Sequence, residues 1–142
     1  NWRVGPASAA PSDLVMAALT FTAEGRGWKP FAPCQLRMRK ESNGDLALRW
    51  TQRSRSLSAD SWVLAEVPMA ETGESYDLEL LDGSTVVRTV FGLTTAAFTY
   101  DSAMQATDFG SPVSSLTLRV YQLGALGRGA AFEQTISIKE AL

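Results

Sequence analysis

The sequence predicts an all-β fold in which about seven short strands form a sandwich, preceded by a separate N-terminal arm. From residue 33 onward apolar and polar residues alternate with a period of two, as in strands with one buried face. Turn signals of Gly, Asn and Asp recur between these runs. The 142 residues, 45% of them apolar, suffice for one domain with its own core. We therefore divide the chain into an arm, 1–31, and a sandwich, 32–142.

The arm contains prolines and small residues that indicate a linker, and within it we predict one short helix at 13–23. Ser12 is a suitable N-cap, and Asp13 suits the first helical turn. Gly25 and Gly27 would end the helix. Four residues on one face recur at helical spacing: Val15, Ala18, Leu19 and Thr22. Because the chain begins with Asn1, we expect a processed piece or the C-terminal part of a longer protein.

Two alternating runs, at 36–39 and 46–50, predict the first hairpin around Asn43-Gly44. A two-residue loop would place Met38 opposite Arg49 and mix the two faces. Opposed residues share a face, so parity selects the three-residue loop Ser42-Asn43-Gly44 with Gly44 left-handed. This loop produces two apolar pairs: Met38 with Leu48, and Leu36 with Trp50.

The next hairpin is predicted around Asp82-Gly83, with a two-residue type I′ turn. That turn pairs Leu78 with Val87 on the inner face and Asp77 with Arg88 on the outer face. Further strands are expected at about 96–100, around Leu116–Val120 and around Phe132–Ile138. The segment 101–110 is expected to be a turn or one helical turn. Residues 54–72 form a long polar connection, and "GALGRGAA" is the last hairpin connection.

Composition argues against several classes of function. The formal net charge of -2 gives no reason to expect nucleic-acid binding, and no apolar run is long enough to span a bilayer. The sequence contains no His, which removes Ser-His-Asp and Cys-His catalytic arrangements and His metal sites. The single Cys34 cannot form an internal disulfide, and without a His partner it is not expected to act as a nucleophile. We therefore expect no enzyme, cofactor or metal.

Five arginines are the first candidates for a binding surface: Arg37, Arg39, Arg49, Arg53 and Arg55. They are expected on the outer face of the first hairpin or in the loop beyond it. There they can contact an anionic partner, such as a surface polysaccharide or a neighbouring protein. The alternative is a solvated sheet face whose charges discourage edge pairing.

Trp62 is the second candidate, because an exposed Trp in the polar 54–72 connection can stack on a sugar or anchor a protein contact. The alternative is a side chain folded back over the end of the sandwich. Glu66, Glu71 and Glu74 can be imagined as a glycosidase pair, but we expect surface acids. Asp101 and Asp108 can be imagined as cation ligands, but we expect capping and turn roles.

The strand region resembles a fibronectin type III module in three stretches. "APCQLRMR" resembles the opening strand after a proline, and "GDLALRW" resembles the second strand, which ends in the core Trp50. "SLTLRVYQL" resembles the later strand whose alternating run ends in a core valine. The long 54–72 connection and Leu116, at a position where that family commonly has Tyr, depart from the pattern. The resemblance implies an immunoglobulin-like sandwich.

The whole chain also resembles the C-terminal part of the "host specificity" baseplate protein of gene transfer agents and tailed phages. The similar stretches run in order through nearly all of residues 3–131: "RVGPA", "GWKPFAPCQLRMR", "LALRWTQRSR", "DSWVLAEVPMAETGESYDLELLDG", "FTYDSAMQATDFG" and "VSSLTLRVYQLGALGRG". The resemblance implies a virion protein at the tail tip, attached to upstream domains and other tail proteins and trimeric through its parent protein. It also implies a link to host recognition, with host surface polysaccharide as a partner, and no catalytic residues.

The leading hypothesis is therefore a non-catalytic structural or adhesion module of a tail tip. A second hypothesis is a carbohydrate-binding domain appended to a cell-wall or polysaccharide hydrolase, which requires a row of exposed aromatic residues. Only Trp62, with Trp28 or Tyr121, can supply one. A third is an enzyme in its own right, against which the missing His counts.

Overall fold

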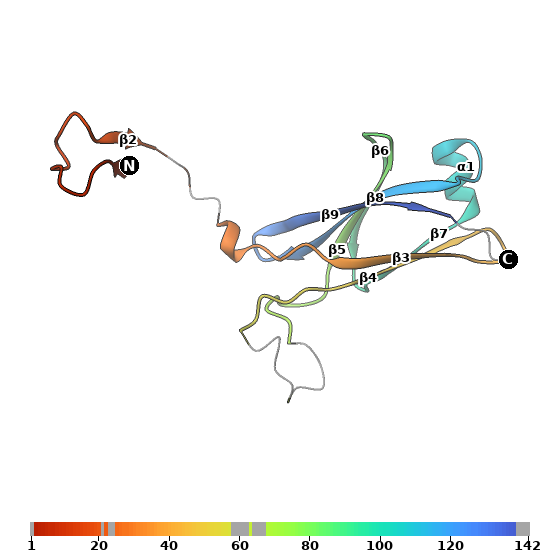
Figure 1. The fold of residues 1–142 in the computed structure, drawn as a ribbon. Helices are drawn as coiled ribbons and strands as arrows, with labels where there is room; N and C mark the ends of the chain where they lie inside the picture. The colour runs from red at the N-terminus through yellow and green to blue at the C-terminus, as the bar shows by residue number, and fades with distance from the viewer. Residues whose placement is uncertain (1, 21, 23–24, 58–62, 64–67, 139–142) are drawn as a thin grey trace.

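The computed structural model describes residues 2–20, 22, 25–57, 63 and 68–138, and within them seven strands form a β-sandwich (Figure 1). One sheet has three strands in the order β3-β4-β7, and the other has four in the order β6-β5-β8-β9. The sandwich elements are β3 (Cys34–Lys40), β4 (Leu46–Thr51), β5 (Tyr76–Asp82), β6 (Thr85–Leu93), β7 (Ala97–Tyr100), α1 (Ser102–Phe109), β8 (Ser115–Gly124) and β9 (Gly127–Ser137). The predicted all-β sandwich is confirmed.

The core lies between the two sheets and is built from the inward-facing residues of each strand. Leu46, Leu48 and Trp50 of β4 are buried, and their neighbours Ala47 and Arg49 face outward. The Trp50 ring meets Tyr76 of β5 edge-on, with ring centroids 5.3 Å apart. Such an aromatic pair stabilises the contact between the sheets beyond its area burial. The remaining fully buried side chains include Leu78, Leu80, Tyr100, Leu116, Leu118 and Val120.

The register of the first hairpin confirms the parity argument over most of its length. Met38 pairs with Leu48, and Gly44 adopts the left-handed φ of 88° in the three-residue loop. The register shifts between Cys34 and Arg37, so Gln35 and Leu36 together oppose Trp50, in place of the predicted one-to-one pair of Leu36 with Trp50. Gln35, at a φ of 53°, lies in this bulge. A bulge adds one residue to one strand and bends it, so β3 can enter the sheet with Leu36 still buried.

The register predicted for the second hairpin is wrong. The two turn residues are Gly83 and Ser84 rather than Asp82 and Gly83, and only Gly83 has a positive φ, as a type II′ turn requires. In the predicted type I′ turn, Asp82 would be a central residue with a left-handed conformation. With Gly83 at the first turn position, Asp82 remains in the strand. Two register shifts follow in the pairing of β5 with β6, and in both the extra residue lies on β6. The resulting pairs are Leu78 with Val90 and Leu80 with Arg88, in place of Leu78 with Val87 and Asp77 with Arg88.

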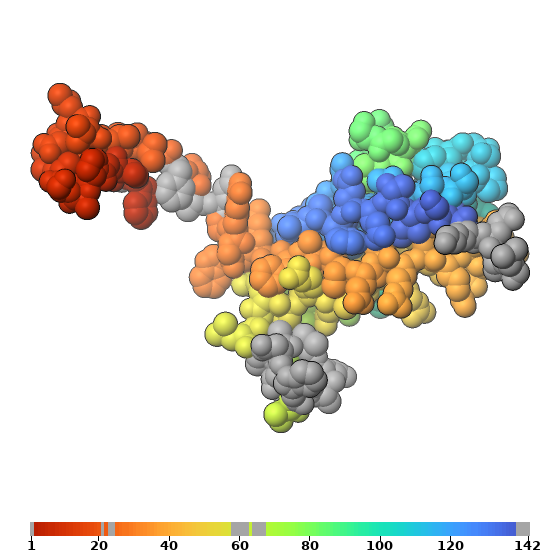
Figure 2. All heavy atoms as spheres, viewed as in Figure 1, coloured from red at the N-terminus to blue at the C-terminus, as the bar shows by residue number. Residues whose placement is uncertain are grey.

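The helix predicted at 13–23 is wrong over its described residues, 13–20 and 22, which contain no helix, while residues 21, 23 and 24 lie outside the described part of the chain. Strands β1 (Trp2–Val4) and β2 (Ala17–Leu19) pair as a small antiparallel hairpin, and the described arm up to residue 20 stands off from the sandwich (Figure 2). The Asp13 side chain accepts a hydrogen bond from the Ala10 backbone N–H at 2.9 Å, in a turn rather than a helix. Ser and Asp favour turns as readily as helix starts, and a short helix without a packing partner is marginal.

The connection after β7 contains α1, a longer helix than the single turn expected. Asp101 caps it by accepting a hydrogen bond from the Met104 backbone N–H at 2.7 Å, which confirms the predicted capping role. A 3₁₀ turn, η1 (Arg26–Trp28), precedes the sandwich. Among the described residues, the structure contains no helix long and apolar enough to cross a membrane.

Candidate functional site

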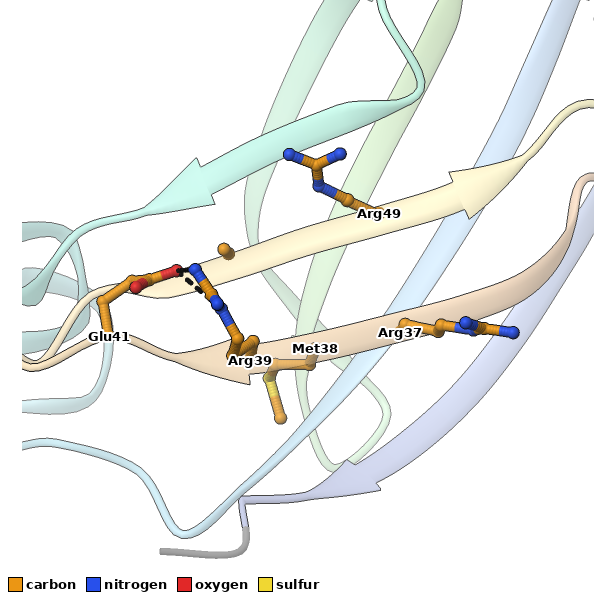
Figure 3. Close-up of a pocket in the computed structure, with 6 residues that line it drawn as sticks. Arg37, Met38, Arg39, Glu41 and Arg49 are labelled. Carbon is orange, nitrogen blue, oxygen red and sulfur yellow. Dashed lines mark hydrogen bonds and ion pairs between the residues drawn. The ribbon is translucent and has the colours of Figure 1, made fainter. Parts of the chain in front are cut away.

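Three of the candidate arginines line one groove on the outer face of the three-stranded sheet (Figure 3). This arginine groove encloses about 580 Å³ and is lined by Arg37, Met38, Arg39, Glu41, Ala47 and Arg49. Strand alternation turns the three guanidinium groups outward, because Leu36, Leu48 and Trp50 occupy the buried face. Its lining carries three positive side chains against one negative, which favours an anionic ligand.

Arg37 and Arg49 lie directly opposite each other on β3 and β4. Among the residues that the structure describes, neither guanidinium has a carboxylate within the 4.0 Å of an ion pair. Like charges directly opposite on neighbouring strands are destabilising. A polyanion above the groove would relieve this repulsion, so the pair is suited to binding a negatively charged partner.

Arg39 differs from its two neighbours because it has an intramolecular partner. Its Nε and Nη2 atoms donate to Glu41 Oε1 at 3.0 and 2.7 Å, while its side chain stays 79% exposed. Figure 3 shows the Arg39 guanidinium turned toward Glu41, whereas Arg37 and Arg49 extend away from that pair. Exposed ion pairs contribute little to stability, so Arg39 can exchange Glu41 for another acid at small cost.

The structure places the other two candidate arginines elsewhere. The Arg53 guanidinium stacks over the Phe31 ring, 5.1 Å from its centroid, and lines a different groove. Arg55 donates to Glu71 at 2.7 Å, and the Glu71 side chain is only 4% exposed. This ion pair ties both ends of the 54–72 connection together, a structural role. Trp62 lies outside the described residues.

The acidic candidates of the described chain are engaged by neighbouring side chains. Glu71 forms an ion pair with Arg55, and Glu74 accepts a hydrogen bond from the Tyr76 hydroxyl at 3.0 Å. Asp108 accepts two bonds from Arg88 and one from the Tyr100 hydroxyl, and these donors hold the pKa of its carboxyl below the usual value. Glu66 lies outside the described residues. Within the described ranges, no group of three or more His, Cys, Asp or Glu could hold a metal ion.

The outer face of the four-stranded sheet holds a charged network that the sequence did not predict. Arg128 of β9 donates to Asp77 and Glu79 of β5, at 2.6 Å each. Its guanidinium also lies over the Tyr121 ring at 4.6 Å and the Phe91 ring at 5.5 Å. The alternation along β5 signals that Asp77 and Glu79 share a face. Arg128, however, sits in a Gly-rich segment with no strand pattern.

A row of exposed aromatic residues, as a carbohydrate-binding module requires, is not assembled from the described candidates. Trp28 is 70% exposed, but it lies on η1 before the sandwich. The Tyr121 ring lies beneath Arg128 on the outer face of the four-stranded sheet. The arginine groove is therefore the strongest candidate for a functional surface.

No protein-family model and no curated protein sequence matches this chain. Among solved structures, the extracellular region of rat CD45, domains d3–d4, aligns with a TM-score of 0.52 at 16% identity over 77% of this chain. The chain spans about half of that fragment, 49% of its length. The fibronectin type III domain of human fibronectin type III domain containing protein 3 aligns with a TM-score of 0.47 at 17% identity, covering 78% of this chain and 89% of that one. At such identities the likeness concerns the fold alone, and the fold of this chain is a fibronectin type III-like β-sandwich.

Proposed function

We propose that this domain is a non-catalytic binding module whose arginine groove attaches a phage-like tail tip to an anionic polymer on the host surface. The observation that carries the proposal is the pair Arg37 and Arg49, which lie opposite each other on an exposed face without a carboxylate partner in the described chain. Retaining such a pair costs stability in the free domain. A negatively charged ligand removes the repulsion between the two arginines and forms charge-assisted hydrogen bonds with them, and both effects favour binding.

The tail-tip setting is supported by the ordered similarity of residues 3–131 to the "host specificity" baseplate protein of gene transfer agents and tailed phages. In that setting the domain is a virion component whose partners are upstream domains of the same chain and other tail proteins, in a trimeric parent protein. The polymer is then an acidic polysaccharide of the bacterial surface. Its repeating charges suit a groove in which arginines follow one another along β3 and β4.

Binding of the isolated chain to polygalacturonate tests the groove directly. We expect salt-sensitive binding by isothermal titration calorimetry. The double variant R37Q/R49Q should bind at least about tenfold more weakly, because the loss of even one charge-assisted contact costs about 1.5 kcal/mol. The control R3Q/R119Q removes the same charge from other surfaces and should bind like the wild type. Equal binding by R37Q/R49Q, or equal binding of neutral dextran, would refute the proposed role of the groove.

Particles that carry the full-length parent protein test the biological role. We expect R37Q/R49Q particles to assemble at normal yield but to adsorb to host cells several-fold more slowly, because surface charges mainly govern association rates. Loss of assembly in this variant would instead assign the groove to a contact between tail proteins. Normal assembly and infection after deletion of residues 33–142 would contradict the whole proposal.

A further inference from the structure

We propose that a second groove, where the segment before β3 joins the sandwich, binds a small organic anion of about monosaccharide size. This junction groove is lined by Arg26, Lys29, Pro30, Phe31, Ala32, Arg53, Arg128, Gly129 and Ala130. It encloses about 510 Å³, within the range of roughly 300–1,000 Å³ typical of small-ligand sites. It shares no lining residue with the arginine groove.

The charge of the lining points to an anion. Among the described residues that line the groove, four side chains are cationic and none is a carboxylate. Among the described residues, Lys29 and Arg53 have no acidic partner within ion-pair distance. The Arg128 guanidinium donates to Asp77 and Glu79 at 2.6 Å each, so its charge is already compensated within the protein. Lys29 and Arg53 are thus the charges that a ligand would compensate.

The backbone of this segment is held in place against the last hairpin. The Pro30 carbonyl accepts a hydrogen bond from the Ala130 backbone N–H at 3.4 Å. A Cβ atom at Gly129 would lie closer than 3.0 Å to that carbonyl, so only glycine permits the approach. Pro30 itself is buried. Lys29 and Phe31 therefore project from a preformed position, which lowers the entropy cost of binding.

The apolar part of the groove indicates which kind of molecule bears the negative charge of the ligand. Phe31 is 45% exposed while its ring contacts the Arg53 guanidinium, and Pro30 and Ala32 flank it. The Arg53 backbone N–H donates to Gln122 Oε1 at 3.2 Å, which fixes the base of that side chain. A matching ligand has an apolar ring face that packs on Phe31. It also has a carboxylate or phosphate group that contacts Lys29 and Arg53. A uronate or a sugar phosphate has this combination.

Titration of the 142-residue chain with three probes tests the inference: D-glucuronate, glucose 1-phosphate and glucose. We expect amide NMR shifts at residues 29–32, 53 and 128–130 with one or both anions, and none with glucose. The variant K29Q/R53Q should weaken anion binding about tenfold or more, and R53K should retain most of it, because the charge is kept. Whichever anion binds more tightly identifies the headgroup, carboxylate or phosphate.

The matched control is R37Q/R49Q, which removes two charges from the arginine groove and should leave these titrations unchanged. The two sites are thereby tested separately. The protein can lose polygalacturonate binding and keep the NMR shifts with the small anions, or lose these shifts and keep polygalacturonate binding. Equal shifts with glucose, an unchanged affinity in K29Q/R53Q, or the absence of shifts with both anions would overturn the inference.

Discussion

Replacing Asp108 with Asn tests how α1 holds the two sheets together at one end of the sandwich. Arg88 of β6 donates to the Asp108 carboxylate through Nε at 2.6 Å and Nη2 at 2.9 Å. The Tyr100 hydroxyl, at the end of β7, donates to the same carboxylate at 2.8 Å. One carboxylate on α1 thus joins a strand of each sheet. Asn preserves the shape of the side chain and an acceptor for Tyr100, but it removes the charge.

The magnitude follows from the burial of the pair. Hydrogen bonds to charged groups contribute about 1.5–3 kcal/mol each, and the Asp108 side chain is only 7% exposed. Arg88 is 27% exposed, so solvent screening reduces its share of the bidentate contact. We expect D108N to lower the free energy of unfolding by about 2 kcal/mol. For a domain of this size the corresponding change in Tm is a decrease of roughly 6–8 °C.

The pH dependence of this loss has a definite sign. Arg88 and Tyr100 hold the pKa of Asp108 below its usual value, so the unfolded chain binds the proton more readily than the folded chain. The stabilisation is fully present above the unfolded pKa of about 3.9 and is lost as the pH falls through the lower folded pKa. The difference between wild type and D108N should therefore be largest near neutral pH and disappear once the pH has fallen below the folded pKa of Asp108.

Urea unfolding followed by circular dichroism at several pH values measures both quantities. Y100F is the control, because it removes one donor and leaves the ion pair, with an expected loss of about 1 kcal/mol. The reasoning fails if D108N stays within about 0.5 kcal/mol of the wild type at pH 7, the usual range of neutral surface substitutions. It also fails if the loss at pH 7 persists undiminished in acid.

Two further predictions concern packing and ionisation. G129A should lower stability by about 1–3 kcal/mol in thermal unfolding, because its Cβ would collide with backbone atoms of Pro30, whereas G73A, with nothing within 4 Å, should be close to neutral. An unchanged Tm in G129A would contradict the close approach of Gly129 to the Pro30 carbonyl group. Burial and the hydrogen bond to Glu74 raise the pKa of Tyr76, so stability should fall as the pH rises above about 10, where the unfolded tyrosine ionises. Y76F should make this alkaline decline shallower in unfolding titrations, and an identical slope would show that Tyr76 does not contribute.

Local patterns were sufficient to predict the strands and most of their buried faces. Residues 46–50 alternate strictly, and the structure buries Leu46, Leu48 and Trp50 as expected. Loop parity likewise predicted the pairing of Met38 with Leu48. Both inferences depend only on near neighbours along the chain and on which face water can reach. They succeed because a strand places alternate side chains on opposite faces wherever it lies in the fold.

Bulges and the arm were not predicted correctly, because their conformation depends on distant contacts. Where the register shifts between Leu80 and Leu81, the extra residue is Val87 of β6, which lies between the partners Val86 and Arg88. Leu80 and Leu81 are adjacent in β5 and both are buried, so both faces of that strand are covered there. A bulge is selected by what packs on both faces of the strand, and neighbouring sequence does not reveal that. In the arm, the described residues 13–20 are almost all exposed and pack on no surface that would stabilise a helix, and Ser12 and Asp13 lie in turns instead.

For the candidate sites, the sequence by itself determined that Arg37, Arg39 and Arg49 share one solvent-facing surface, because strand alternation alone requires it. Only the tertiary structure decided which arginines remain available to a ligand. Arg55 meets Glu71 sixteen residues away, and Arg128 meets Asp77 fifty-one residues away, only after the strands have assembled. The junction groove likewise exists only because the chain before β3 docks on the last hairpin. Ion pairs between residues far apart in sequence form only when the strands pair into sheets and the long connection folds back on itself, which no local pattern encodes.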